Sequence, residues 1–211
     1  MSIYQYAVIT KQETAQTVTS LDEIDMENVD YKRQPDIDFL AEHIVTQGGF
    51  CCGIFRGGMF GLATNQVAIF SAWDNSGSAK QCIAKLENEL AYLIDDQCEL
   101  TATVRPRKPK RIDQDGIYVI RWIRIHARDI DEYTGLCLET WPAFESNHKA
   151  RCFGVFRVVD AEDPSKLLML TWYATLKDWE QSRQLNPQDK SKWARRSEME
   201  LTHWAEVGRL A

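Results

Sequence analysis

The side chains best suited to chemistry lie on one predicted strand, from Ile117 to His126. Alternate residues of a strand face the same side. One face therefore carries Tyr118, Ile120, Trp122, Arg124 and His126, and the other carries Ile117, Val119, Arg121, Ile123 and Ile125. The aliphatic second face is expected to lie under helices. The first face, with aromatic, guanidinium and imidazole groups, is typical of a mostly apolar ligand site with a few polar groups.

Two residues of this face are the catalytic candidates, His126 and Arg124. His126 ends the strand and suits an acid–base or axial-ligand role better than His148, which lies in a predicted loop beside Lys149. The alternative is that His126 is a surface or capping residue. The polar groups of this face could equally fill the interior and satisfy one another, since a fold alone does not imply a function.

Ligand binding is assigned to Tyr118, Trp122, Arg157, Trp172 and Tyr173. Trp122 with Trp172 or Tyr173 could stack a flat molecule, although most tryptophans pack in cores. Arg157 follows the segment CFGVF as Arg56 follows CGIF, and a guanidinium there could hold a carboxylate or phenolate. The alternative is an internal ion pair with Asp131, Glu139 or Glu145.

The motifs of several other chemistries are absent. The six cysteines form no CxxC pair and no His/Cys cluster has ligand spacing, so no metal is predicted. The cysteines are expected to be buried, reduced thiols. The sequence has no GxSxG, Walker or GxGxxG motif, and no cofactor is predicted.

The chain has 211 residues, of which 44% are hydrophobic and 27% charged, as in ordinary globular proteins. A net charge of −6 argues against broad nucleic-acid binding. No apolar run approaches the roughly 18–20 residues of a membrane span. The N-terminus has no secretory pattern, and a cytoplasmic location is expected. The basic, Pro-containing segment Arg105–Arg111 is interpreted as a connector, with an anion or RNA patch as the alternative.

Three blocks recur in the same order and predict a duplicated unit of about 100 residues. CGIFR at 52–56 matches CFGVFR at 152–157. Val67–Trp73 matches Leu167–Tyr173, and Asp36–Leu40 matches Asp129–Tyr133. The predicted domains are residues 1–105, a linker at 106–115, and residues 116–211.

The first unit reads as β-α-β-β-α-β, the ferredoxin-like pattern. Its elements are expected at 3–10, 36–46, 51–60, 66–73, 78–94 and 98–104, with an irregular insertion at 11–30. The second has strands at 117–126, 151–159 and 167–173, and helices at 129–144, 176–183 and about 191–209. Asp129 is expected to cap its helix and Pro142 to disturb the last turn. The second unit is therefore predicted to be β-α-β-β-α-α, with its last strand missing.

The second half resembles the NIPSNAP-like members of the dimeric α+β barrel superfamily. The resemblance rests on RW, DIDEY and WPAFE, on FGVFR, and on LTWY and WEQSR, and it covers most of residues 116–211. It implies an α+β fold in which two ferredoxin-like sheets meet as a barrel, within one chain or between chains. Relatives include cofactor-independent monooxygenases, haem-degrading enzymes, haem-binding peroxidase-like proteins and proteins of no known activity.

Three functions follow from this resemblance as expectations. The first is an enzyme, monooxygenase-like, that binds a small aromatic or hydrophobic ligand in an open barrel walled by Trp122, Arg124 and Tyr173. The second is a non-catalytic module with a filled barrel that forms homo-oligomers, as a dimer. The third is haem binding, for which His126 would be the axial ligand.

Overall fold

The computed structural model describes residues 2–11, 35–159, 161–184 and 190–211. Most of the predicted insertion at 11–30 lies outside the described residues. The first half of the chain contains β1 (Ile3–Lys11), α2 (Ile37–Thr46), β2 (Phe50–Phe60), β3 (Gln66–Trp73), α3 (Ser76–Glu89) and β4 (Tyr92–Ala102). The second half contains β5 (Ile117–Ile125), a 3-10 turn (Ala127–Asp129), α4 (Ile130–Asn147), β6 (Ala150–Val158), β7 (Ser165–Tyr173), α5 (Leu176–Gln181), α6 (Lys190–Met199) and β8 (Thr202–Leu210).

The strands form one closed barrel in the order β1-β3-β2-β8-β5-β7-β6-β4, and every pairing is antiparallel. Its two halves, β4-β1-β3-β2 and β8-β5-β7-β6, have the same strand order, that of a ferredoxin-like unit. The α+β prediction is therefore confirmed. The seams β2–β8 and β4–β6 join the halves, so the barrel closes within a single chain.

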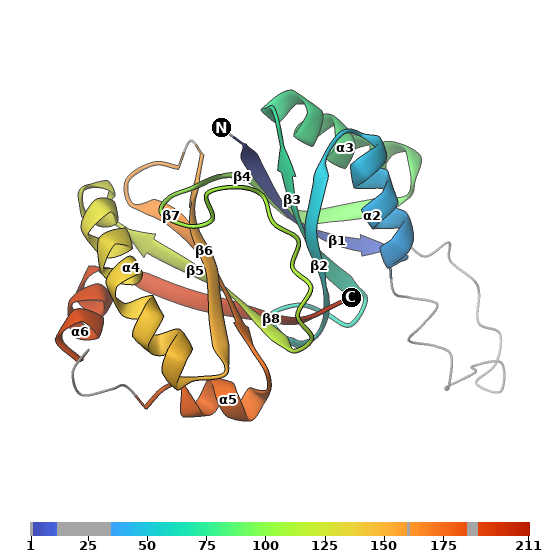
Figure 1. Ribbon diagram of the computed structural model, residues 1–211. Coiled ribbons are helices and arrows are strands. Elements are labelled where there is room, and N and C mark those ends of the chain that lie inside the picture. The colour runs from blue at the N-terminus through green and yellow to red at the C-terminus, as the bar shows by residue number, and fades with distance from the viewer. Residues whose placement is uncertain (1, 12–34, 160, 185–189) are drawn as a thin grey trace.

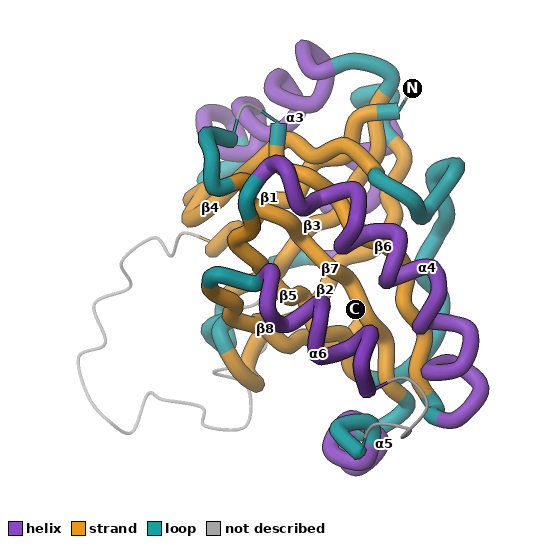
Figure 2. Tube along the Cα trace, turned by 90° about the vertical axis from the view of Figure 1, so that its left-hand side faces the viewer, coloured by secondary structure: helices purple, strands orange, loops and turns teal. Residues whose placement is uncertain are grey.

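The helices cover the outside of the barrel, with α2 and α3 over the first half and α4, α5 and α6 over the second (Figures 1 and 2). Leu40 and Ile44 of α2, and Cys82 and Leu86 of α3, pack against the outer side of the first sheet. Tyr133, Cys137 and Trp141 of α4 pack likewise on the second. Burial of such side chains contributes about 25 cal/mol per Å² and fixes each helix on its sheet.

The last strand, predicted to be missing, is present. The helix expected at 191–209 ends at Met199, and Thr202–Leu210 is β8, which pairs with β5 along its length and with β2 near Leu210. Pairing with a neighbouring strand overrides local preferences, and no short-range signal in the sequence reports that pairing.

Other element boundaries differ from the predictions for local reasons. The helix expected to reach Ile94 ends at Glu89, because Ala91 takes a positive φ of 54°, and the closing strand starts at Tyr92. The helix α4 continues through Pro142 to Asn147, and the Asp129 side chain forms no capping hydrogen bond. A 3-10 turn before the helix occupies the place expected for a simple cap.

The two faces of β5 lie as the alternation predicted. Tyr118, Ile120 and Trp122 are in the core inside the barrel, whereas Ile123 and Ile125 lie under α4. The core inside the barrel is rich in aromatic rings, which include Tyr4, Tyr6, Phe55, Phe70, Tyr118, Trp122 and Phe156. Tyr4 contacts Phe70 and Phe156 at ring distances of 5.6 and 5.0 Å. The expectation of an open lumen beside Trp122 is therefore wrong.

All six cysteines are free, and four of them, Cys52, Cys82, Cys137 and Cys152, are buried as expected. Burial raises the pKa of the Cys52 and Cys152 thiols to about 12 in each case. Among the described helices, none is long and apolar enough to cross a membrane. Within the described ranges, no group of three or more His, Cys, Asp or Glu side chains could hold a metal ion.

Candidate functional site

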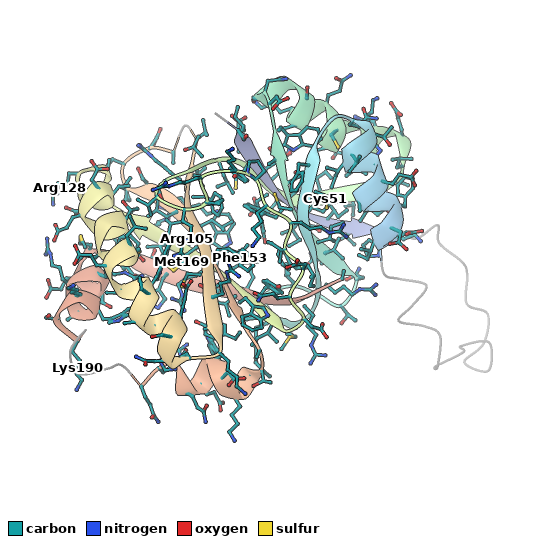
Figure 3. The ribbon with its side chains drawn as sticks, viewed as in Figure 1. Cys51, Arg105, Arg128, Phe153, Met169 and Lys190 are labelled. Atoms are coloured by element: carbon teal, nitrogen blue, oxygen red, sulfur yellow. The ribbon has the colours of Figure 1, made fainter. Side chains whose placement is uncertain are left out.

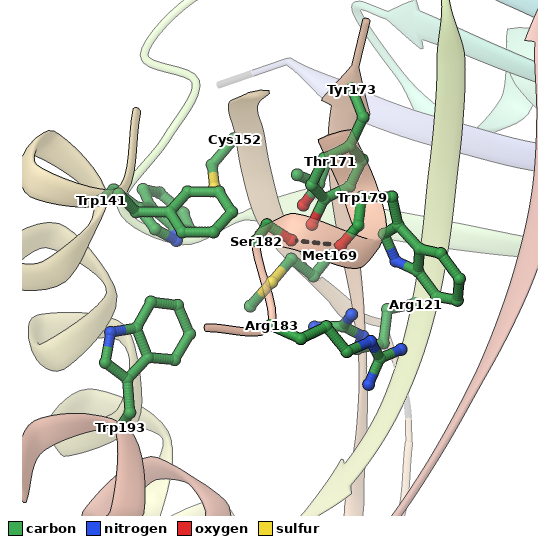
Figure 4. Close-up of a pocket in the computed structure, with 11 residues that line it drawn as sticks. Arg121, Trp141, Cys152, Met169, Thr171, Tyr173, Trp179, Ser182, Arg183 and Trp193 are labelled. Atoms are coloured by element: carbon green, nitrogen blue, oxygen red, sulfur yellow. Dashed lines mark hydrogen bonds between the residues drawn. The ribbon is translucent and has the colours of Figure 1, made fainter. Parts of the chain in front are cut away.

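A cleft opens on the outside of the second half, between its sheet and the helices α4, α5 and α6 (Figure 4). We call it the helix–sheet cleft. Its first hollow, of about 220 Å³, is lined by Arg121, Trp141, Phe144, Cys152, Met169, Thr171, Tyr173, Trp179, Ser182, Arg183 and Trp193. A second hollow of about 200 Å³ shares Arg121, Trp179, Arg183 and Trp193 and adds Arg196, Ser197, Glu200, His203 and Ala205. Each hollow is smaller than the about 300–1,000 Å³ of typical small-molecule sites, and the two adjoin at the four residues that they share.

Polar contacts hold the three helices that form the cleft. Arg195 of α6 donates two hydrogen bonds to Glu132 of α4, at 2.6 and 2.8 Å, and Lys192 pairs with Glu139 at 2.8 Å. At α5, the Thr175 hydroxyl accepts a hydrogen bond from the Asp178 amide at 3.1 Å, which caps the helix. A tryptophan ring from each helix, Trp141 of α4, Trp179 of α5 and Trp193 of α6, lines the cleft.

Arg196 is the most unusual residue of the cleft, because it is an arginine only 2% exposed. Its Nη2 atom donates to the Tyr133 hydroxyl at 3.0 Å, and its guanidinium lies 4.9 Å from the Tyr133 ring and 4.5 Å from the Trp193 ring. Its Nε and Nη1 atoms are buried and have no hydrogen-bond partner among the described residues. Leaving such donors unsatisfied costs about 1–3 kcal/mol for each group.

The charge of Arg196 is retained. Burial lowers the pKa of this guanidinium, but the neighbouring Tyr133 and Glu200 act in the opposite direction, and the net shift is upward. Arg121 and Arg183 lie on the same side of the cleft (Figure 4). The guanidinium carbon of Arg183 lies 4.6 Å from the centre of the Trp179 ring. The cleft thus brings three cations to a site where Glu200 is the single acidic lining residue of the described chain.

A further unsatisfied donor lies in the opposite wall. The indole Nε1 of Trp141 is buried without a hydrogen-bond partner among the described residues. The guanidinium of Arg105 lies 4.8 Å from the centre of the Trp141 ring, a cation–π contact. Donors without acceptors and an excess of positive charge both favour a ligand that presents oxygen atoms with negative charge.

Glu200 and His203 form an ion-pair contact at the edge of the second hollow. Glu200 Oε2 lies 3.1 Å from His203 Nδ1, and Glu200 Oε1 accepts from the Tyr133 hydroxyl at 2.8 Å. The Glu200 side chain is 12% exposed and that of His203 is 62% exposed. A carboxylate that orients an imidazole, leaving Nε2 toward solvent or ligand, is an arrangement found in general bases.

The sequence-predicted site residues do not come together. Of the seven, Tyr173 alone lines the helix–sheet cleft. Tyr118 and Trp122 are packed inside the barrel, where Trp122 contacts Tyr6 and Trp204 at ring distances of 5.2 and 6.3 Å. Trp172 lies at one end of the barrel and donates from Nε1 to the Asp115 carbonyl at 2.8 Å.

The two catalytic candidates lie at the end of β5, outside the cleft. Arg124 is exposed, and His126 is partly exposed with Nδ1 3.4 Å from Asp163 Oδ2. Asp163 also accepts from the Ala127 amide at 2.7 Å, so this His–Asp contact fixes a loop. Arg157 is exposed and donates to the Ser165 hydroxyl at 3.4 Å. No signal in the sequence distinguished Arg196, Glu200 and His203, which fell within a single predicted helix.

Haem does not suit this cleft. The first hollow has no histidine among its described lining residues. The second has His203, but its Nδ1 is engaged by Glu200 and its side chain is largely exposed. An axial haem ligand needs an apolar pocket around the imidazole, whereas the hollow that His203 lines also has three arginines and Glu200 in its lining.

Comparison of the sequence with protein-family models and with curated proteins gave no match. Solved structures match the whole chain. An anthrone oxidase-like protein has a TM-score of 0.61 at 10% identity, over 100% of this chain and 91% of that one. A protein from Lactobacillus acidophilus NCFM described as a "putative monooxygenase" gives 0.53 at 10%, over 100% and 93%. A mutant chlorite dismutase from Candidatus Nitrospira defluvii gives 0.61 at 8%, over 100% and 91%. These likenesses show the dimeric α+β barrel fold.

Proposed function

We propose that this protein oxidises a flat, enolisable aromatic compound with dioxygen in the helix–sheet cleft, without a cofactor. The observation that carries the proposal is the buried Arg196, whose Nε and Nη1 atoms have no acceptor among the described residues. Arg121 and Arg183 lie beside it, and Trp179 and Trp193 form walls on which an aromatic ring would stack. The anthrone oxidase-like and monooxygenase neighbours agree with this chemistry.

The residues of the cleft divide the chemistry between them. His203 Nε2 takes a proton from the ring CH2 that lies opposite the substrate carbonyl and is acidified by it through the fused aromatic rings, while Glu200 contacts Nδ1 and stabilises the imidazolium. The guanidinium groups of Arg121, Arg183 and Arg196 stabilise the enolate oxygen, where negative charge develops. The carbanion then adds to dioxygen, and the peroxide takes back the proton. Loss of water leaves a new carbonyl, so one oxygen atom enters the product and the other leaves as water.

Dioxygen uptake with anthrone tests this proposal. The parent chain is expected to consume dioxygen and release anthraquinone, and His203→Gln is expected to lower kcat/KM by about a hundredfold, as loss of a general base does. Arg196→Met is expected to lower it by at least about tenfold. Arg128→Gln serves as the matched arginine control, since Arg128 is exposed on the 3-10 turn.

A competing location is tested in the same assay. His126→Gln removes the histidine that the sequence singled out, at the far end of β5. If this variant loses the activity and His203→Gln keeps it, the cleft is not the site. If the parent binds anthrone but consumes no dioxygen, the protein is a binding module, which is the second candidate function.

We also propose three narrower properties from the sequence: kinship with NIPSNAP-like proteins, a cytoplasmic location and a homodimer. Exposed apolar side chains on neighbouring strands support a subunit contact. Phe60 on β2 is 58% exposed and Trp204 on β8 is 40% exposed. Sedimentation velocity at several concentrations tests the dimer, and a species of constant monomeric mass would exclude it.

A further inference from the structure

The segment between the two halves crosses one end of the barrel (Figure 1). It is tied down at both ends. Thr103 donates from its amide and its hydroxyl to the Val155 carbonyl, at 3.0 and 2.8 Å, and the Val155 amide donates to Arg105. Farther along, the Ile112 amide donates to the Cys52 carbonyl at 2.7 Å, and the Gln114 carbonyl accepts from Tyr118. The segment is therefore part of the wall of the barrel end.

A cavity of about 580 Å³ lies beneath this segment. We call it the barrel-mouth cavity. Its inner wall is apolar and is formed by rings from both halves, among them Tyr4, Phe70, Phe153, Phe156 and Trp172. Figure 3 shows Phe153 and Arg105 near the middle of the molecule, where the segment crosses. The volume lies within the range of about 300–1,000 Å³ for small-molecule sites.

The rim of the cavity is positively charged. Arg107, Lys108 and Lys110 of the crossing segment and Arg151 of β6 are exposed, and within the described chain none of the four forms an ion pair. The one lining acid, Glu145, is neutralised by Arg105 at 2.7 Å and accepts from the Cys152 amide at 2.8 Å. An anion at the rim would therefore meet four cations and no free carboxylate of the lining.

A residue that lines the cavity also has a hydrogen-bond acceptor without a partner. The side-chain Oε1 of Gln114 is buried and has no hydrogen-bond partner among the described residues, and Gln114 lines the cavity. Buried polar atoms are normally hydrogen-bonded, so an exception calls for a missing partner. A ligand with a hydroxyl group near its ring would supply that partner.

We propose that the barrel-mouth cavity binds an aromatic compound that carries one anionic group, a carboxylate or a phosphate. The ring lies on the aromatic inner wall, and the anion lies among the cations of the crossing segment. This site is distinct from the helix–sheet cleft and does not depend on the function proposed there. It also gives the basic segment a role beyond that of a connector.

Isothermal titration with 2-naphthoate tests the proposal, with 1-naphthyl phosphate and neutral 2-naphthol as companion probes. The variant Arg107→Gln/Lys108→Gln/Lys110→Gln changes exposed residues and is expected to fold. It should weaken naphthoate binding by about tenfold or more, because three exposed ionic contacts to the anion are lost. Binding of neutral naphthol, which forms no such contacts, should not change. The stronger of the two anionic probes identifies the head group. The matched control is Lys11→Gln/Lys80→Gln/Arg128→Gln, which removes equal charge elsewhere on the surface.

Three results would overturn the proposal. Equal affinity of the parent and the segment variant for naphthoate would show that the rim cations do not hold the anion. A larger loss in Arg183→Gln, which lies in the helix–sheet cleft, would place the ligand there instead. Displacement of naphthoate by a single-stranded oligonucleotide at low concentration would identify the segment as a nucleic-acid patch.

Discussion

At the scale of single residues, Arg196 sets the character of the second half. A buried arginine with two unpartnered donors does not stabilise a fold, because desolvation of the charge is not fully compensated. In a site that binds an anion, however, the same unpartnered donors and positive charge would stabilise the ligand. The cost to stability and the capacity for binding are then two effects of the same side chain.

Arg196→Met separates these two effects. Methionine fills a similar volume between Tyr133 and Trp193 and removes the unsatisfied donors. We expect the free energy of unfolding to stay the same or to rise by up to about 2 kcal/mol, measured by urea denaturation, while ligand binding in the cleft is lost. A loss of more than about 3 kcal/mol would show that Arg196 is mainly structural.

Glu206 gives a pH-dependent prediction. Burial raises the pKa of this carboxyl, against the opposing hydrogen bonds from Tyr6 and Trp122. A group with a raised pKa in the folded state contributes stability that is fully present below its unfolded pKa and is lost as the pH rises through the folded value. Glu206→Gln removes this loss.

The variant should therefore have the same Tm as the parent near pH 4, where the Glu206 carboxyl is protonated. It should have a higher Tm near pH 7, where that carboxyl is ionised. Thermal unfolding followed by circular dichroism at a series of pH values measures the difference. A variant less stable than the parent at neutral pH would mean that the hydrogen bonds to the charged carboxylate outweigh the cost of burial.

At the scale of elements, the repeated sequence blocks correspond to equivalent strands that also share a local irregularity. CGIFR and CFGVFR occupy equivalent strands, and each strand has an irregularity at the same place, between Cys51 and Gly53 in β2 and between Cys152 and Gly154 in β6. The strand and helix periods were therefore sufficient for most of the topology. They failed at β8, whose outer residues are largely exposed and whose pairing partners are distant in the sequence.

The candidate site was less predictable than the fold for a related reason. The alternation along β5 correctly separated the two faces, but Tyr118 and Trp122 lie in the packed core, whereas Arg124 and His126 lie at the exposed end of the strand. The cleft depends on how α5 and α6 are placed over the other face, which includes Arg121. Burial of Arg196 and the Glu200–His203 contact arise from tertiary packing, which the composition of residues 190–203 does not report.

A glycine substitution at Gly154 tests the placement of the crossing segment, and one at Gly135 serves as the comparison. A Cβ on Gly154 would lie 2.3 Å from the Arg105 carbonyl oxygen, so Gly154→Ala should destabilise the protein by about 1–3 kcal/mol. Gly135 lies inside α4 with no atom within 4 Å of an added Cβ, so Gly135→Ala should stabilise it by about 0.5–1 kcal/mol. Chemical denaturation measures both. A neutral Gly154→Ala would show that the segment does not press against β6.

At the scale of the whole molecule, the barrel is continuous but its strand pairings differ in extent. β5 and β7 pair along their whole lengths, from Ile117 to Ile125. Among the described residues, the ladder between β4 and β6 pairs Leu100–Ala102 with Phe156–Val158, and the amides of Val159 and Thr103 add hydrogen bonds to the carbonyls of Glu99 and Val155. In the part of the chain that the structure describes, the ladder between β2 and β8 pairs residues near Leu210, is interrupted, and resumes at Val207.

We therefore expect the seams to open first. Backbone amides of β4 and β6 at their shared seam should exchange with deuterium at least about tenfold faster than those between β5 and β7, because local opening follows the number of bonds that must break. Hydrogen exchange read by mass spectrometry or NMR measures this difference. Uniform protection around the barrel would mean that the two halves unfold as a single cooperative unit.

The central claim is that the helix–sheet cleft stabilises an aromatic enolate, and one measurement addresses it without turnover. Anthrone is mixed with the protein in the absence of dioxygen, at a pH where free anthrone is neutral, and the absorption difference spectrum is recorded. We predict the absorption band of the anthrone anion with the parent and its absence with Arg196→Met and His203→Gln. A spectrum of neutral anthrone with the parent, or an equal anion band with both variants, would contradict the account.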